Sequence, residues 1–293
     1  MTTINVWLPA AANLFLIITM AAATPSRNAD LDEKPFDKLS DQAISEWGQT
    51  ALAVNATKWK HGETEHFVIH FFRSGDMIAR RSEKFYAEIH GFFGNRADKM
   101  QGRKSHIFAF CESDDWETFK RAVDKKKNVA GVTRGNEFFY MAFGEEKQFD
   151  YRGHVQAHEM THLVFNRFFT GHLPLWLNEG VAEYFGMKKT LDTATFRRTL
   201  SRAKPFGLER LFKTNEYPKT EDEVHSFYAE ASIVVDFLTQ TADRRGLLTK
   251  FIDALIEDPD VDKALVLYGY KSREEFSKAY ERHCSLFVGR RNK

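Results

Sequence analysis

The chain carries the stretch His158-Glu159-Met160-Thr161-His162, the HExxH pattern that places a carboxylate between two imidazoles. On a helix, His158 and His162 would lie on one face, about 6 Å apart along the axis, so both could bind one metal ion. Glu159 would lie roughly 100° around the helix from His158. It is therefore offset too far to be a natural ligand, but it flanks the ion where a base acting on water would stand.

The residues on either side of the motif predict a helix. Asp150 is a candidate N-cap, and Gly171 suits the left-handed position that follows the last turn of a helix. The histidine pair lies largely off an apolar arc formed by Val155, Met160, Leu163, Val164 and Phe168. The alternative is a buried helix with two core histidines, and a carboxylate segment further along the chain favours the metal site instead.

A catalytic zinc site typically has three protein ligands and one open position, so a third ligand is required. The long motif HExxHxxGxxH is excluded, because residues 165 and 168 are both phenylalanine. Glu179 follows Pro174, which can begin a second helix. A helix from Leu175 to Phe185 would run back past the first helix and bring Glu179 to the ion. His172 is a competing third ligand.

Two further side chains belong near this site. Glu183 lies one turn after Glu179, where it would hold a ligand histidine through that histidine's other ring nitrogen. The alternative for Glu183 is a solvated helix charge. His154 shares the face of His158 and His162, but a pair formed by His154 and His158 has no glutamate in the base position.

This region resembles the gluzincin zinc metallopeptidases of the peptidase-MA-like superfamily. The likeness rests on the HExxH motif followed by Leu173-Pro174-Leu175-Trp176-Leu177-Asn178-Glu179-Gly180, and it covers roughly residues 154–186. It implies one zinc ion with His158, His162 and Glu179 as ligands and Glu159 as general base. A looser likeness places residues 65–69 in the family's opening strand and residues 267–270 in its closing helical region.

The chain departs from the related zinc aminopeptidases in one respect. Those enzymes carry a Gly-x-Met-Glu-Asn segment that grips the amino terminus of the substrate, and this sequence has none. By position, the nearest equivalent is Gly131-Val132-Thr133-Arg134-Gly135-Asn136 with the following Glu137–Met141. It is either an edge strand that binds an extended peptide by strand addition or an ordinary hairpin. An endopeptidase or a peptidase of narrow specificity is therefore preferred.

The expected reaction is hydrolysis of peptide bonds by metal-activated water. Zinc lowers the pKa of water to near 7, and Glu159 would take a proton from the attacking water and pass it to the leaving amine. Tyr228 is the candidate donor to the developing oxyanion, and His225 is the second candidate. A packing role is the alternative for Tyr228.

Composition limits the remaining possibilities. The chain has 293 residues, 43% of them hydrophobic, with 27 phenylalanines that are expected in the core. The net charge is +1 with acidic and basic residues well mixed, which gives no support for a nucleic-acid partner. The expected partner is a peptide or protein substrate. Cys111 and Cys284 either pair in an oxidising compartment or remain two free thiols.

The N-terminus predicts export to the periplasm or the medium. Residues 6–23 are largely apolar and end in Ala21-Ala22-Ala23, as in a cleaved signal peptide, although the leading segment has no Lys or Arg. An uncleaved membrane anchor is the alternative, and only then would the protein contact a membrane.

The expected fold is α+β and zincin-like: a small twisted mixed sheet with helices, the HExxH helix, and a C-terminal helical half. Residues 1–23 form the signal peptide or anchor, residues 24–58 a linker (24–40) and an N-terminal helix (39–57), and residues 59–290 the zinc metallopeptidase domain. That domain divides into a sheet-bearing half at 59–150 and a helical half at 151–290. Strands are expected at 66–72, 105–111 and 137–143, and helices at 78–93, 192–203, 227–240, 245–257 and 272–288.

Two other hypotheses remain. The chain could be a non-proteolytic zinc hydrolase or a catalytically silent peptide-binding module of the same fold. It could also be a helical, envelope-associated structural protein in which the motif is a coincidence.

Overall fold

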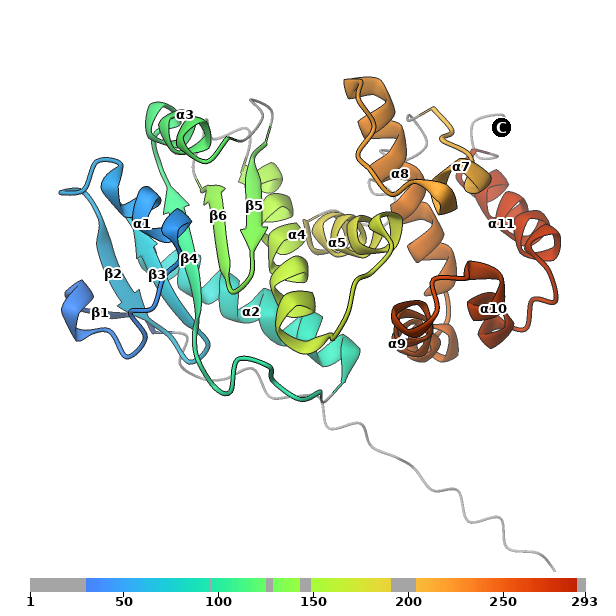
Figure 1. Ribbon diagram of the computed structural model, residues 1–293, viewed down its shortest axis with the longest axis horizontal. Coiled ribbons are helices and arrows are strands. Elements are labelled where there is room, and N and C mark those ends of the chain that lie inside the picture. The colour runs from blue at the N-terminus through green and yellow to red at the C-terminus, as the bar shows by residue number, and fades with distance from the viewer. Residues whose placement is uncertain (1–29, 95, 125–128, 143–148, 191–203, 289–293) are drawn as a thin grey trace, which may run out of the picture.

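The computed structural model describes residues 30–94, 96–124, 129–142, 149–190 and 204–288 (Figure 1). A six-stranded mixed sheet has the order β1-β2-β3-β4-β6-β5. The central strands β3, β4 and β6 are parallel, and β1, β2 and β5 pair antiparallel with their neighbours. The strand bounds are β1 Asp32–Glu33, β2 Lys60–Glu63, β3 Phe67–Phe71, β4 Ser105–Phe110, β5 Gly131–Arg134 and β6 Glu137–Met141.

Helices make up most of the remainder. Around the sheet lie the short 3₁₀ helix η1 Phe36–Lys38 and the helices α1 Glu46–Ala53, α2 Gly75–Phe93 and α3 Ser113–Ala122. The site helices are α4 Phe149–Phe168 and α5 Leu175–Thr190. The C-terminal half contains α7 Leu208–Lys213, α8 Glu221–Leu238, α9 Ala242–Glu257, α10 Val261–Leu265, η3 Val266–Tyr268 and α11 Arg273–Val288. The predicted α+β class, with a mixed sheet and a C-terminal helical half, is confirmed.

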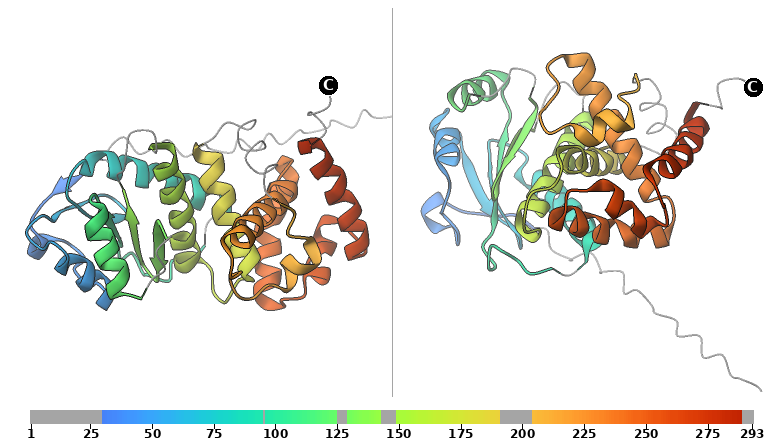
Figure 2. Two further views of the ribbon diagram at one scale, coloured as in Figure 1. Left: turned by 90° about the horizontal axis from the view of Figure 1, so that it is seen from above. Right: turned by 45° about the vertical axis from the view of Figure 1, so that its right-hand side comes forward.

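The sheet is covered on both faces, which accounts for the largely apolar strands β3, β4 and β6 at its centre. Neighbouring side chains along a strand point to opposite faces, so β4 sends Ile107 and Ala109 to one side and Phe108 and Phe110 to the other. The first side packs against α2 and α4, and the second against α1 and α3 (Figure 2). The aromatic residues of β6 divide in the same way. The high phenylalanine content therefore fills two core layers, as expected.

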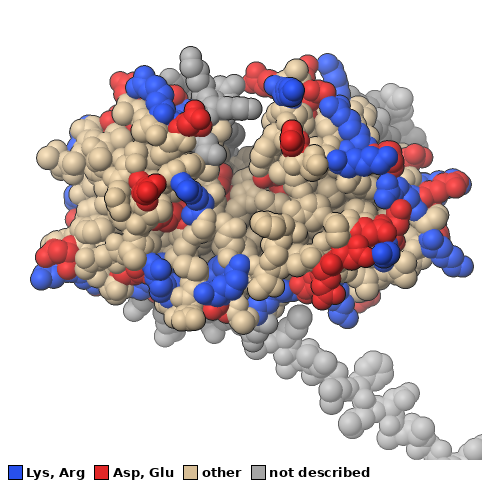
Figure 3. Space-filling model, viewed as in Figure 1, with Lys and Arg blue, Asp and Glu red and all other residues tan. Residues whose placement is uncertain are grey.

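The helical half is joined to the sheet-bearing half through α4 and α5. Figure 1 shows α5 lying between α4 and α8, with α9, α10 and α11 beyond α8. The apolar cluster on the α4 side of the sheet is continuous with the core of the helical half, where Trp176 of α5 is fully buried. In the space-filling view the surface is hollowed between the two halves (Figure 3).

Several predicted element bounds need correction. The N-terminal helix does not run from 39 to 57 but covers only Glu46–Ala53, because Ser45 caps it by accepting hydrogen bonds from the amides of residues 47 and 48. Part of the expected linker is structured, since Asp32 and Glu33 pair with β2 and Leu39 is buried. Helix α8 begins at Glu221 rather than near residue 227.

Two predictions fall partly or wholly outside the described residues. The apolar stretch at 6–23 and the helix expected at 192–203 both lie there.

Within the described ranges, none of the helices combines the length and the apolar character needed to cross a bilayer. Cys111 is buried and Cys284 is partly buried, and both are free thiols, so the alternative of two unpaired cysteines is confirmed.

Candidate metal centre

Two helices from different parts of the sequence bring the predicted ligands together. Helix α4 carries the HExxH motif, and its neighbour α5 begins directly after Pro174, whose carbonyl accepts hydrogen bonds from the amides of residues 177 and 178. Asp150 lies inside α4 and is not its N-cap. Gly171 has the predicted positive φ of 103°, but it lies beyond the end of α4 at Phe168.

Gly180 explains why a glycine follows Glu179 in α5. A Cβ atom at position 180 would lie 2.7 Å from the backbone oxygen of Ala231 in α8, too close for any side chain. The glycine therefore allows α5 and α8 to pack backbone against backbone. This close packing places α5, and with it Glu179, firmly between α4 and the helical half.

The three predicted ligands converge. The Nε2 atoms of His158 and His162 are 3.1 Å apart, and Glu179 Oε2 lies 3.3 Å from the first and 3.5 Å from the second. Donors held tetrahedrally at about 2.0–2.1 Å from an ion are roughly 3.3–3.4 Å apart, so these separations suit zinc. The donor set of two imidazoles and one carboxylate also suits zinc.

The other ring nitrogen of each histidine has a hydrogen-bond acceptor. His158 Nδ1 donates to Glu183 Oε2 at 3.2 Å, and His162 Nδ1 donates to the side-chain oxygen of Asn178 at 3.3 Å. Both contacts place the proton on Nδ1 and leave Nε2 free to bind an ion. The predicted position of Glu183 against a ligand histidine is therefore present in the structure.

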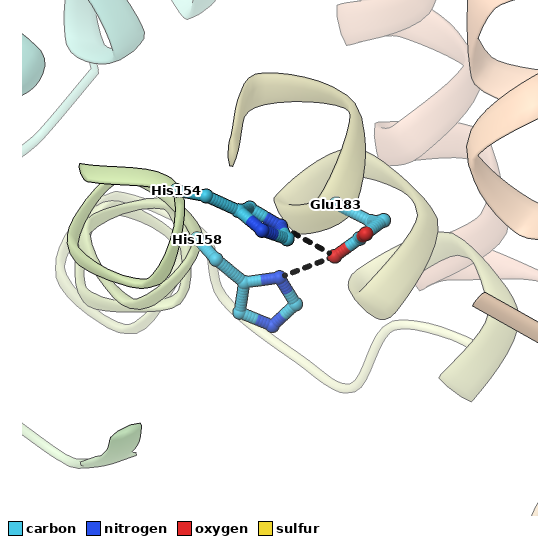
Figure 4. A group of neighbouring side chains, drawn as sticks. All are labelled: His154, His158 and Glu183. Atoms are coloured by element: carbon cyan, nitrogen blue, oxygen red, sulfur yellow. Dashed lines mark hydrogen bonds and ion pairs between the residues drawn. The ribbon is translucent and has the colours of Figure 1, made fainter. Parts of the chain in front are cut away.

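A second set of side chains capable of holding a metal shares His158 with the first. It consists of His154, His158 and Glu183, and both histidines point at the same carboxylate oxygen (Figure 4). His154 Nε2 lies 3.0 Å from Glu183 Oε2. Two N–H donors to one carboxylate account for these distances without an ion, and His158 cannot both keep its Nδ1 proton and bind a metal there. We therefore interpret His154 and Glu183 as residues that hold the ligand histidine His158 in place, not as part of a second metal site.

The packing of His154 is close. A Cβ atom at Gly186 of α5 would lie 2.3 Å from the imidazole carbon Cδ2 of His154. Only glycine at 186 leaves room for that ring beside Glu183. The chain thus makes space on α5 for a third imidazole that touches the carboxylate but not the predicted ion position.

Glu159 extends from α4 toward strand β5 at the edge of the sheet. Its Oε2 atom accepts a hydrogen bond of 2.7 Å from the hydroxyl of Thr133 in β5. A Cβ atom at Gly131 would lie 2.7 Å from Glu159 Cγ, so the base and β5 are in close contact. Glu159 belongs to neither metal-capable set found among the described residues. This position fits a base beside the ion and does not fit a ligand.

Strand β5 is an edge of the sheet. It pairs with β6 through the tight turn at Gly135 and Asn136, so the segment is a hairpin whose first strand lies at the edge of the sheet, and binding of an extended peptide there stays a prediction. Helix α4 presents Glu159 to this edge strand, where Thr133 contacts it.

The candidate oxyanion donors are placed differently from one another. The ring of Tyr228 lies 6.0 Å from the ring of His158, centroid to centroid, on the side of the site formed by α8. His225 is exposed in the first turns of α8. His172 is exposed and belongs to neither metal-capable set of the described chain, so the structure does not bring it to the two histidines.

The electrostatics of the centre favour a cation. Burial disfavours charge on Glu179, yet the neighbouring His162 and His158 outweigh it and hold the pKa of that carboxyl well below its usual range. Burial also disfavours charge on His158, but the hydrogen bonds with Glu179 and Glu183 raise its pKa well above the ordinary value. Positive charge is therefore stabilised among these carboxylates, and a bound dication would replace a proton there.

Sequence reasoning missed three residues that contact this centre. Asn178 orients His162, Thr133 holds Glu159, and the hydroxyl of Tyr217 donates to Glu179 Oε1 at 2.6 Å. Asn178 could have been found, because it adjoins Glu179 on the first turn of α5. Thr133 lies in the 131–136 segment that the sequence offered as a possible substrate-binding edge strand, but its contact with Glu159 was not foreseen, and nothing near Tyr217 in the sequence points to the centre.

Comparison with known proteins gives no family assignment: no protein-family model matches the chain, and no curated protein sequence matches it.

Proposed function

We propose that this protein is a zinc-dependent peptidase of the gluzincin type, with His158, His162 and Glu179 as ligands and Glu159 as general base. One observation carries the proposal. Three donor atoms from two helices lie at the mutual separations of a tetrahedral zinc site, and a fourth side chain, not a ligand, stands beside them on the flank of α4. A coincidental motif in a structural protein does not require this convergence.

The chain's own residues suit hydrolysis of an acyl bond. Zinc held at this centre would acidify water and polarise the substrate carbonyl. The carboxylate of Glu159, oriented by Thr133, is placed to accept a proton from attacking water and to pass it to the leaving amine. Tyr228 is the residue we assign as donor to the developing oxyanion.

The free edge of β5 supports a peptide as the substrate. An extended peptide can add to a sheet edge through backbone hydrogen bonds, and β5 lies next to Glu159. A peptide bound in this way would run past the base. We propose internal cleavage rather than removal of the first residue, because the sequence lacks the aminopeptidase segment. Export remains a prediction from residues 6–23, outside the described chain.

The test is digestion of a peptide library by purified protein. Cleavage by the wild type should stop when a chelator removes the metal and return when zinc is added. The variant Glu159→Gln should cut nothing while retaining zinc, because it loses the base but none of the three ligands. Equal cleavage by Glu159→Gln and wild type would refute the mechanism. A protein that holds zinc but cuts no peptide in the library would contradict the peptidase assignment.

A further inference from the structure

Tyr217 lies in the segment between α7 and α8, yet its hydroxyl reaches the candidate metal centre. The residue as a whole is 51% exposed, while the hydroxyl donates to the buried carboxylate of Glu179 at 2.6 Å. Tyrosines commonly bury the ring and leave the hydroxyl near water. Tyr217 is half exposed as a whole, yet it directs its hydroxyl to a buried carboxylate.

The chain holds this tyrosine in place from both sides. Pro218, the next residue, is buried, and a proline restricts its own φ and the backbone of the residue before it. On the other side, the hydroxyl of Tyr217 is held by the carboxylate of Glu179 in α5.

The two oxygens of Glu179 have separate partners. Oε2 faces the imidazoles, 3.3 Å from His158 Nε2 and 3.5 Å from His162 Nε2, whereas Oε1 accepts from Tyr217. A hydrogen bond from a neutral hydroxyl to an ionised, buried carboxylate is short and strong, so Oε1 is not free to turn toward the histidines.

From this geometry we infer that Tyr217 is a positioning residue for the metal centre, which commits Glu179 to binding zinc through Oε2 alone. The inference rests on the proposed function and extends it to a residue outside the motif. Outer hydrogen-bond partners of metal ligands typically contribute 10–100-fold to metal affinity. Removing the Tyr217 hydroxyl should therefore weaken zinc binding within that range and release Oε1.

The experiment compares Tyr217→Phe with Tyr270→Phe, using zinc as the probe and a chromogenic chelator as competitor. Tyr270→Phe is the matched control, because it also removes one hydroxyl, whose partner is Arg244 rather than a residue of the centre. We expect the zinc Kd of Tyr217→Phe to rise about 10–100-fold. The Kd of Tyr270→Phe should stay within about twofold of the wild type. Circular dichroism of both metal-free variants checks that they are folded.

Cobalt substitution provides a second readout. Because the released Oε1 becomes available to the ion, the visible spectrum of cobalt-loaded Tyr217→Phe should differ from that of the wild type, whereas Tyr270→Phe should match the wild type. A folded Tyr217→Phe with wild-type zinc affinity and cobalt spectrum would overturn the inference, even if its turnover fell. A wild type that binds no stoichiometric zinc would overturn the proposed function as well, so the two failures are distinguishable.

Discussion

Replacing Glu183 with alanine should weaken metal binding without touching a metal ligand. Glu183 Oε2 accepts from His158 Nδ1 at 3.2 Å and from His154 Nε2 at 3.0 Å, so Glu183→Ala leaves both donors without this acceptor. Loss of such a partner of a ligand histidine lowers metal affinity about 10–100-fold. That range corresponds to about 1.4–2.7 kcal/mol of binding free energy.

The matched control is Glu230→Ala in α8. Glu230 is 8% exposed, as is Glu183, and its carboxylate accepts from the hydroxyl of Tyr280 at 2.8 Å and the amide of Phe206 at 3.1 Å. Each variant removes a buried carboxylate that accepts two hydrogen bonds, a loss that costs about 1–3 kcal/mol, so both metal-free proteins should be less stable to urea. Only Glu183→Ala should show a raised zinc Kd in chelator competition.

Two results would refute this reasoning. Wild-type zinc affinity in Glu183→Ala would mean that the orientation of His158 does not depend on this carboxylate. An equal loss of affinity in Glu230→Ala would mean that general destabilisation, rather than the contact with His158, weakens metal binding.

Three further predictions follow from other contacts. Thr133→Val should lower kcat about fivefold to tenfold with zinc affinity unchanged, since it removes the hydrogen bond that orients Glu159; an unchanged kcat would remove Thr133 from the mechanism. Tyr228→Phe should slow turnover by about 100-fold or more, and a wild-type rate would assign Tyr228 to packing. Burial lowers the pKa of His106 from 6.5 to about 4. As the pH falls, the unfolded chain therefore protonates His106 at a higher pH than the folded protein does. In urea titrations, the contribution of His106 to the free energy of unfolding should be complete above pH 6.5 and should fall by roughly 1.4 kcal/mol per pH unit toward pH 4. A His106→Gln variant whose free energy of unfolding has the same pH dependence would contradict this.

The part of the centre that sequence predicts is the part fixed by helical periodicity. The spacing of His158 and His162 and the placement of Glu183 one turn after Glu179 follow from local geometry, and Pro174 marks where α5 begins. Strands β3 and β4 were predicted from their alternating pattern, and β6 was expected at 137–143, where it covers Glu137–Met141.

The features that were missed depend on contacts between distant residues. Helix α1 begins after Ser45, whose amide donates a hydrogen bond to Glu137 of β6. Nothing in the residues around Ser45 indicates this contact. Strand β2 is polar, since it lies near the edge of the sheet, so no apolar pattern marks it. Tyr217 contacts Glu179 across the fold, and its role is visible only once α5 and the segment before α8 are placed together.

The measurement that tests the central claim most directly is the zinc content of purified protein by mass spectrometry under native conditions. The wild type should carry one zinc ion per chain, whereas folded His158→Ala and Glu179→Ala should each carry much less, because each lacks one of the three converging donors. Full zinc occupancy in Glu179→Ala would contradict the assignment of that carboxylate. A wild type purified and reloaded with zinc that still holds no ion would contradict the metal centre itself.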